Sequence, residues 1–263
     1  MYNFDFVKPT TLQDAIAALS RDEAMPLAGG QTLIPSMKQR LAAPSVLVSL
    51  TGIPELKGVC RADDGAVCIG AATTHAEIAR ETAAIYPAIA ALAGGIGDPA
   101  VRNRGTIGGS LANNDPSACW PAGVLGSGAT IVTNTRQIAA DDFFQGMFTT
   151  ALEPGEIITE IRFPVPEAAA YAKFEQPASR FALTGAFVAK FADGVRVAIT
   201  GASEGGVFRW REAEEALGAS FSPEAVDGLS VSADGMIGDL HGTPEYRANL
   251  VRVMTRRAVA RAQ

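Results

Sequence analysis

The sequence has few of the side chains that usually bind metals or act as nucleophiles. Its 263 residues include three cysteines and two histidines. An iron–sulfur centre normally needs four such ligands, and these residues stand at no recognisable metal-binding spacing. The odd cysteine count, without a secretory leader, also argues against a disulfide framework. The sequence therefore predicts no metal site, and an iron–sulfur cluster that works with this chain must be held by a partner.

Familiar nucleotide-binding motifs are also missing. No glycine pair is followed by the Lys-Ser/Thr of a P-loop, and no G-x-G-x-x-G opens a βαβ unit. His75 and His241 leave little from which to build a hydrolytic triad, and the acidic pairs at 63–64 and 141–142 are typical of turns. Because no nucleophile or general base stands out, we expect no catalytic side chain and a cofactor that supplies the chemistry.

Charge and hydropathy exclude two further classes of partner. The chain has 22 Lys+Arg against 28 Asp+Glu, a net charge of −6, which argues against nucleic acid as a general partner. No apolar run approaches the roughly 20 residues of a membrane span. Residues 1–9 contain no signal-peptide core. We therefore expect a cytoplasmic protein without a membrane span.

What the sequence does contain is two glycine pairs, each inside a short apolar stretch. The first lies in PLAGGQTLIP (26–35) and the second in RGTIGGSLANNDP (104–116). A diphosphate needs closely packed backbone N–H donors, and glycine lets the backbone approach because no Cβ stands in the way. One such loop is equally typical of a turn. Two of them indicate a single long ligand that is held from both sides.

The first glycine pair falls at the strand-to-helix turn of a predicted βαβ unit. Strands are expected at Ala24–Ala28 and Val46–Leu50, and a helix at Ile34–Ala42 with Pro35 in its first turn. A helix N-terminus binds anions through its free N–H groups and its dipole. This turn is therefore a candidate phosphate site.

A hairpin is expected about Asp64-Gly65, with Cys60 and Cys68 on its two strands. A three-residue loop would place the two thiols directly opposite each other, whereas a two-residue loop would place them on opposite faces. Two interpretations stay open here, a functional cysteine pair and two separate buried thiols.

The last predicted helix, 244–261, is rich in arginine. It carries five arginines and a single acidic residue, Glu245. A solvated face whose late arginines suit the helix dipole and a docking surface for an acidic partner both remain open.

Five motifs, in order along the chain, carry a family resemblance. They are PLAGGQTLIP, IGAATTHAEI (69–78), VRNRGTIGGSLANNDP (101–116), EPGEIITEIRFPVP (153–166) and TPEYRANLVRVMTRRAVARA (243–262). The chain resembles, nearly end to end, the FAD-binding medium subunit of molybdenum hydroxylases, a family that includes the flavin subunits of bacterial carbon monoxide dehydrogenase and xanthine dehydrogenase.

The resemblance implies an α+β fold with two domains. Residues 1–165 would form the FAD-binding domain, with subdomains at about 1–55 and 56–165. The first subdomain is the βαβ unit and the second a mixed sheet with helices. Residues 166–263 would form a C-terminal domain with a small antiparallel sheet and a helical bundle.

The resemblance also implies a set of FAD-binding positions. Residues 28–32 match the family's first pyrophosphate loop, and residues 106–110 match its second. Asp115 falls in the stretch that reaches the ribityl or ribose hydroxyls. Ile158 matches an apolar position near the flavin ring, and Lys173 matches a basic position at the ring edge. For the last two, an ordinary strand-core isoleucine and a surface lysine are equally open interpretations. Cys119 departs from the family, which often has a carboxylate there. The full set is Ala28, Gly29, Gly30, Gln31, Thr32, Thr106, Ile107, Gly108, Gly109, Ser110, Asp115, Ile158 and Lys173.

By resemblance, the chain would be one subunit of a heterotrimer that transfers electrons. A large subunit would hold the molybdenum cofactor and a small subunit the iron–sulfur clusters, and non-covalent FAD in this chain would pass electrons to a terminal acceptor. Two alternatives belong to other functional classes. A free-standing FAD-dependent alcohol oxidase or dehydrogenase would need a general base over the flavin, and none is evident. A non-enzymatic interaction protein would be expected to lose its glycine loops, and both are intact.

Overall fold

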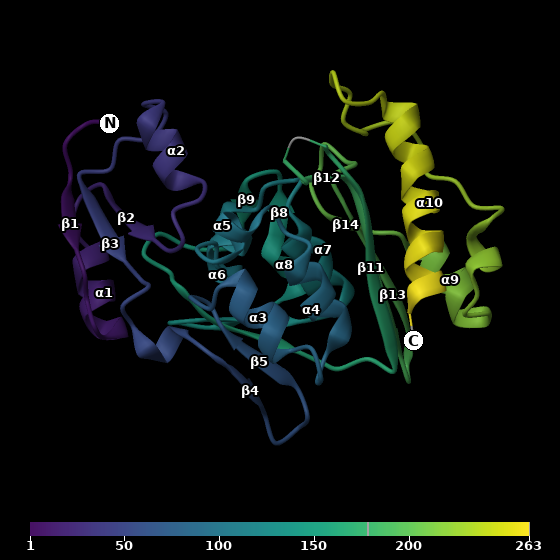
Figure 1. Cartoon of the computed structure of the whole chain (residues 1–263), viewed down its shortest axis with the longest axis horizontal. Helices are drawn as coiled ribbons and strands as arrows, with labels where there is room; N and C mark the ends of the chain where they lie inside the picture. The colour runs from purple at the N-terminus through teal and green to yellow at the C-terminus, as the bar shows by residue number, and fades with distance from the viewer. Residues whose placement is uncertain (178, 263) are drawn as a thin grey trace.

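The computed structural model describes residues 1–177 and 179–262. Its N-terminal unit is a parallel sheet in which β1 and β2 flank the central β3 (Figure 1, purple). β2, α2 and β3 form the predicted βαβ unit. The helix ends at Lys38, earlier than expected, because Arg40 adopts a left-handed conformation with φ 63°. The elements are β1 (Asp5–Val7), α1 (Leu12–Leu19), β2 (Ala24–Leu27), α2 (Leu33–Lys38) and β3 (Val46–Ser49).

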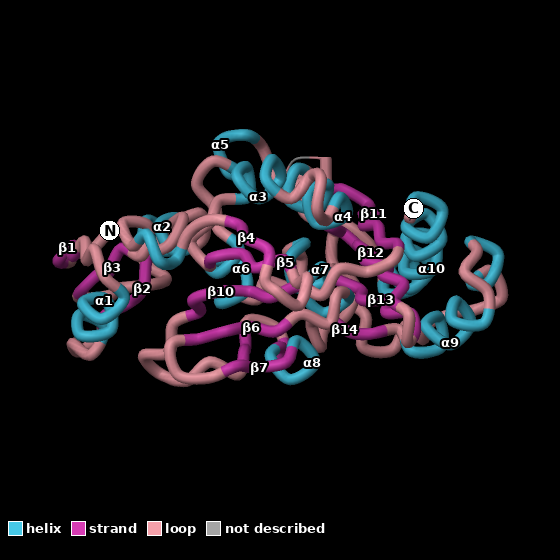
Figure 2. Tube along the Cα trace, turned by 90° about the horizontal axis from the view of Figure 1, so that it is seen from below, coloured by secondary structure: helices cyan, strands magenta, loops and turns pink. Residues whose placement is uncertain are grey.

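The central unit is a five-stranded sheet with helices packed on one face. The strand order is β4-β5-β10-β6-β7, and the strands lie side by side in Figure 2. β8 and β9 form a separate two-stranded sheet. The elements are η1 (Pro54–Leu56), β4 (Val59–Arg61), β5 (Val67–Gly70), α3 (His75–Glu81), α4 (Pro87–Gly94), α5 (Pro99–Arg102), α6 (Ile107–Asn113), α7 (Cys119–Gly126), β6 (Thr130–Thr133), β7 (Gln137–Ala139), α8 (Ala140–Phe143), β8 (Phe144–Gly146), β9 (Thr149–Thr150) and β10 (Ile158–Phe163).

The C-terminal unit is a four-stranded antiparallel sheet with order β11-β12-β13-β14. The long helix α10 runs along one face of this sheet (Figure 1, yellow). Thr243 caps this helix, because its side chain accepts a hydrogen bond from the Tyr246 N–H, and Pro244 stands in the first turn as predicted. The elements are β11 (Ala168–Glu175), β12 (Ala182–Phe191), β13 (Gly194–Thr200), β14 (Phe208–Arg209), α9 (Arg211–Ala219), η2 (Pro223–Val226) and α10 (Pro244–Arg261).

Three hydrophobic clusters correspond to these units. One lies under the N-terminal sheet around Val46 and Val48, one inside the central unit around Trp120 and Ile161, and one between the C-terminal sheet and α10. The other face of the C-terminal sheet packs into the central cluster through Phe187. The predicted division at 165/166 falls between β10 and β11 and stays a prediction.

The predicted α+β class is confirmed, and the structure differs from it in two details. The resemblance implies a mixed central sheet, but the strand pairings of this sheet are all antiparallel. It also implies a C-terminal helical bundle, but α9 and α10 each pack on the sheet and are linked through η2. Strand direction depends on long-range pairing that local sequence does not encode. In the described part of the chain, no helix is both long and apolar enough to cross a membrane.

The arginines of α10 do not form one solvated face. Arg247 is buried and donates to the carbonyl oxygens of Leu183 and Gly201 and to the Asp239 carboxylate. Arg256 pairs with Asp227 at 3.1 Å. Through these hydrogen bonds and ion pairs, Arg247 and Arg256 connect the helix to the rest of the C-terminal unit.

Candidate functional site

A cleft of about 840 Å³ runs along both glycine loops. Its size is within the range of small-molecule and cofactor sites. Both loops line it and lie against each other, although they are about 80 residues apart in the sequence. The predicted residues that line the cleft are Ala28, Gly29, Gly30, Gln31, Thr32, Thr106, Gly108, Gly109, Ser110, Asp115 and Ile158.

The first loop presents a run of backbone donors. Among the described residues, the N–H groups from Gly29 to Leu33 have no hydrogen-bond acceptor. Gly30 makes this possible, because its φ of +73° turns the chain in a way that side chains disfavour. The Thr32 hydroxyl also makes no capping bond. Consecutive free N–H groups at the start of a helix form a concave anion site, so the loop fits a diphosphate.

The second loop is built differently. Thr106 caps α6, and its hydroxyl accepts the Gly109 N–H at 3.2 Å. The N–H groups of Ile107 and Gly108 are taken by the carbonyl oxygens of Thr73 and Ala71. What this loop offers to a ligand is therefore a close backbone surface and the Ser110 hydroxyl, rather than a row of free N–H donors.

Several glycines lie where two segments of the chain pack so closely that a Cβ atom would clash. A Cβ on Gly29 would lie 2.1 Å from the Arg104 carbonyl oxygen, and one on Gly108 would lie 2.6 Å from the Ala71 Cβ. A Cβ on Gly105 would lie 2.7 Å from His75 Nε2. Sequence reasoning assigned the glycines to ligand approach and missed this packing role, which only the folded chain reveals.

Asp115 and Ile158 reach the cleft from two other segments. Asp115 follows α6, and one of its carboxylate oxygens accepts the Ser117 N–H at 2.9 Å. Its other oxygen accepts no hydrogen bond from the described residues and is available to a hydroxyl group. Ile158 begins β10 and is 5% exposed, so it belongs to the central core and to the cleft wall at once.

Two predicted residues lie outside the cleft lining. Ile107 is fully buried and packs into the central core. Lys173 stands on β11 behind the cleft wall, where its Nζ donates to the carbonyl oxygens of Gly95 at 2.7 Å and Arg180 at 2.6 Å. Cys119, the position that departs from the family, does line the cleft, and its Sγ is 3.7 Å from Lys173 Nζ.

His75 also lines the cleft, but as a neutral, fixed side chain. The indole N–H of Trp120 donates to its Nδ1 at 3.1 Å. Burial, and after it the charge of Arg102, lowers the pKa of His75 to about 4. The imidazole is therefore uncharged at neutral pH.

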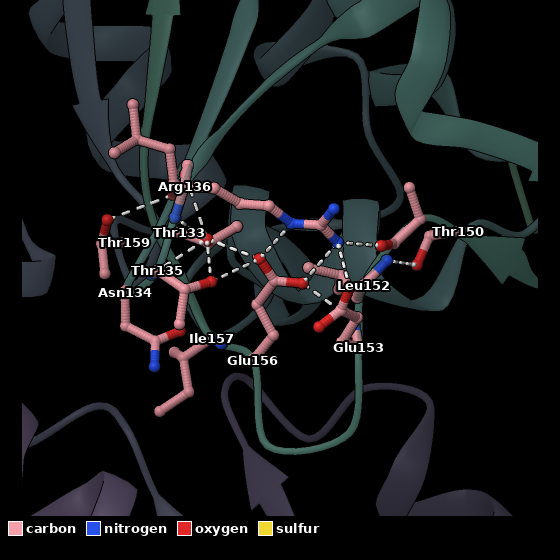
Figure 3. A network of polar contacts seen from close by, with 12 residues as sticks. Thr133, Asn134, Thr135, Arg136, Thr150, Leu152, Glu153, Glu156, Ile157 and Thr159 are labelled. Carbon is pink, nitrogen blue, oxygen red and sulfur yellow. Dashed lines mark hydrogen bonds and ion pairs between the residues drawn. The ribbon is translucent and has the colours of Figure 1, made fainter.

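Glu156 is a cleft residue that sequence reasoning did not assign, although its motif was noted. Arg136 holds both of its carboxylate oxygens at 3.0 Å, and Thr133 and Thr135 donate their hydroxyls to it (Figure 3). The Arg136 guanidinium is the main cause that lowers the pKa of Glu156 to about 2. Beside this network, Asn134 accepts the Ile157 N–H and so fixes the entry to β10.

We expect Glu156→Gln to lower the free energy of unfolding at pH 7 by about 2 kcal/mol, a figure reduced to allow for the half-exposed Arg136. The folded pKa lies below the usual 4.5, so the stabilisation is present above that pH and is lost as the pH falls toward 2. The difference between wild type and variant should shrink over this window in urea titrations. Glu153→Gln is the matched control, because Glu153 is 75% exposed and should change stability little. Equal stability of wild type and Glu156→Gln at pH 7 would contradict this account.

One motif that sequence reasoning overlooked has no functional geometry. Residues 201–205 read GASEG and match the G-x-S-x-G of nucleophile elbows. Ser203 forms an isolated bridge with Met236 just before a turn, its hydroxyl accepts the Gly205 N–H at 3.0 Å, and no helix follows directly. The described structure around it therefore lacks the strand–turn–helix context of such a nucleophile.

The chain is similar in sequence to known proteins. Residues 2–166 match the family described as the FAD binding domain in molybdopterin dehydrogenase. The carbon monoxide dehydrogenase medium chain of Afipia carboxidovorans is 37% identical, over 99% of this chain and 97% of that protein. The nicotine 6-hydroxylase medium subunit of Paenarthrobacter nicotinovorans is 36% identical, over 98% and 96%.

Solved structures give the same result. A chain of the reconstituted CO dehydrogenase from Oligotropha carboxidovorans superimposes with a TM-score of 0.89 at 34% identity, covering 99% of this chain and 97% of that one. These matches define the class as an FAD-carrying subunit of an oxidoreductase. More narrowly, the chain belongs to the family of FAD-binding subunits of molybdenum hydroxylases, and the predicted family and cofactor are confirmed.

Proposed function

We propose that this chain is the electron-transfer subunit of a heterotrimeric molybdenum hydroxylase. It would take electrons from iron–sulfur clusters in a small partner subunit, which receive them from a molybdenum cofactor in a large subunit, and pass them to a terminal acceptor. FAD supplies the chemistry, because a flavin can accept electrons singly and release them in pairs. A cytoplasmic location is part of this proposal.

The observation that carries the proposal is the run of free N–H groups from Gly29 to Leu33 on the cleft floor. Gly29 is buried and Gly30 and Leu33 are half-buried, and backbone donors at such positions normally find a partner, so this run indicates an anionic ligand. In this arrangement the first loop and Ser110 bind the diphosphate, Asp115 binds hydroxyls of the FAD chain, and Ile158 packs near the ring. Lys173 acts indirectly, by holding the Arg180 segment at the cleft edge.

The acid–base properties of the cleft favour an electron carrier over an alcohol oxidase. An alcohol oxidase needs a general base with a pKa near the working pH. His75 has a pKa of about 4 and its Nδ1 is occupied, and Glu156 has a pKa of about 2. Both side chains are poor bases at neutral pH.

The test is the composition of the purified complex and of the isolated chain. We expect one FAD per chain, released into the supernatant by acid precipitation, and no iron or molybdenum in the isolated chain. Two further subunits, one with iron and one with molybdenum, should co-purify in equal amounts. Flavin colour that stays in the pellet, or stoichiometric iron in the isolated chain, would contradict the proposal.

A further inference from the structure

The hairpin between β4 and β5 brings two thiols together. The Ala62 N–H donates to the Ala66 carbonyl oxygen, so the loop has three residues and Cys60 lies directly opposite Cys68. This decides between the two loop lengths that the sequence left open. Cys60 is exposed, and Cys68 is buried.

A carboxylate completes the group from the neighbouring strand. Val67, Ile69 and Ile161 face the central core, so Cys60, Cys68 and Glu160 share the other face of β4, β5 and β10, which lie side by side in Figure 2. Their two sulfur atoms and one carboxylate oxygen all lie within 4.8 Å of one another. The described residues contain no other such group of three.

One cation, Arg162, acts on this group. Arg162 stands opposite Cys68, but its guanidinium is engaged by Asp64 at 3.0 Å. Glu160 forms no ion pair with the described residues. Burial raises the pKa of Cys68 to about 12, the charges of Glu160 and Cys60 add to the rise, and the charge of Arg162 lowers it. A bound cation would reverse the charge effects of Glu160 and Cys60.

We propose that Cys60, Cys68 and Glu160 form a zinc site with three protein ligands and an open fourth position. Zn²⁺ takes cysteine sulfur at about 2.3 Å and carboxylate oxygen at about 2.0–2.2 Å in tetrahedral geometry. Ligand atoms that already converge need only small side-chain movements to reach such distances. A disulfide would use the two sulfurs and leave the Glu160 carboxylate without a partner.

Binding must release protons, because zinc coordinates thiolates. Each thiol that becomes a ligand gives its proton to the solvent, and no electron is transferred. Affinity should therefore rise with pH. The exposed Cys60 gives an ion from solvent access to the site. This proposal does not depend on the proposed electron-transfer function.

The test uses Co²⁺ as a spectroscopic substitute on the reduced, full-length protein. We expect one equivalent to bind, with thiolate charge-transfer absorption and the d–d bands of tetrahedral cobalt at wavelengths beyond the flavin absorption. Added Zn²⁺ should displace it. Calorimetry in buffers of different ionisation enthalpy should show protons released on binding.

Variants make the assignment specific. Cys60→Ser, at an exposed position that should not affect folding, should abolish the cobalt bands, and Glu160→Gln should weaken binding at least tenfold. Cys119→Ser removes the third cysteine and should leave the bands unchanged. Absence of the bands in the wild type, their survival in Cys60→Ser, or formation of a Cys60–Cys68 disulfide in the presence of zinc would overturn the proposal.

Discussion

Removal of FAD from the assembled complex is expected to leave substrate-driven bleaching of the iron–sulfur clusters intact, while turnover with the natural acceptor falls to near zero. We expect this result because the proposed molybdenum and iron–sulfur centres lie upstream of the flavin, in other subunits, and can be reduced without it. Stopped-flow absorption can follow both events in one experiment, because cluster bleaching and acceptor reduction have different spectra.

Two controls separate this result from general damage. An artificial dye that takes electrons from the clusters should still support turnover in the FAD-free complex, and added FAD should restore the natural reaction. If loss of FAD also stops substrate from bleaching the clusters, the flavin lies on the substrate side. The proposed role of the chain would then be wrong, although its membership in the family would stand.

Local sequence signals predicted the elements that depend on neighbours in the chain. The βαβ unit around Gly29-Gly30 follows from hydrophobic runs and a turn, and α10 follows from Thr243 and Pro244 at its start. The hairpin at Asp64-Gly65 follows from its turn residues. These features depend on contacts between residues that are close in the sequence, so they can be predicted from the sequence alone.

Contacts between distant segments could not be predicted in the same way. The antiparallel pairing of the central sheet joins β5 to β10, which are about 90 residues apart. For Lys173 a position at the flavin edge and an ordinary surface lysine were equally open, and its contacts with two carbonyl oxygens from other segments could not be read from the sequence. The facing thiols of Cys60 and Cys68 depended on one residue of loop length.

Gly29→Ala is expected to reduce FAD affinity at least 100-fold, about 3 kcal/mol. Its new Cβ would lie 2.1 Å from the Arg104 carbonyl oxygen and 2.7 Å from the Gly105 Cα. Both are backbone atoms and cannot rotate away, so the two loops must separate. That movement displaces the free N–H groups of the first loop from Ser110 in the second.

Fluorescence titration of FAD into the apo-protein measures the effect, with circular dichroism to show that the variant is folded. Gly218→Ala is the control, because its Cβ meets nothing within 4 Å and alanine favours the helix by up to about 1 kcal/mol. Gly109→Ala should have an intermediate effect, since its Cβ would lie 3.0 Å from the Thr106 hydroxyl and 3.2 Å from the Ala28 Cβ. A side-chain hydroxyl can move by a few tenths of an ångström, whereas the Arg104 backbone cannot. If a folded Gly29→Ala protein bound FAD as tightly as the Gly218→Ala protein, the contact between the loops would not set the geometry of the site.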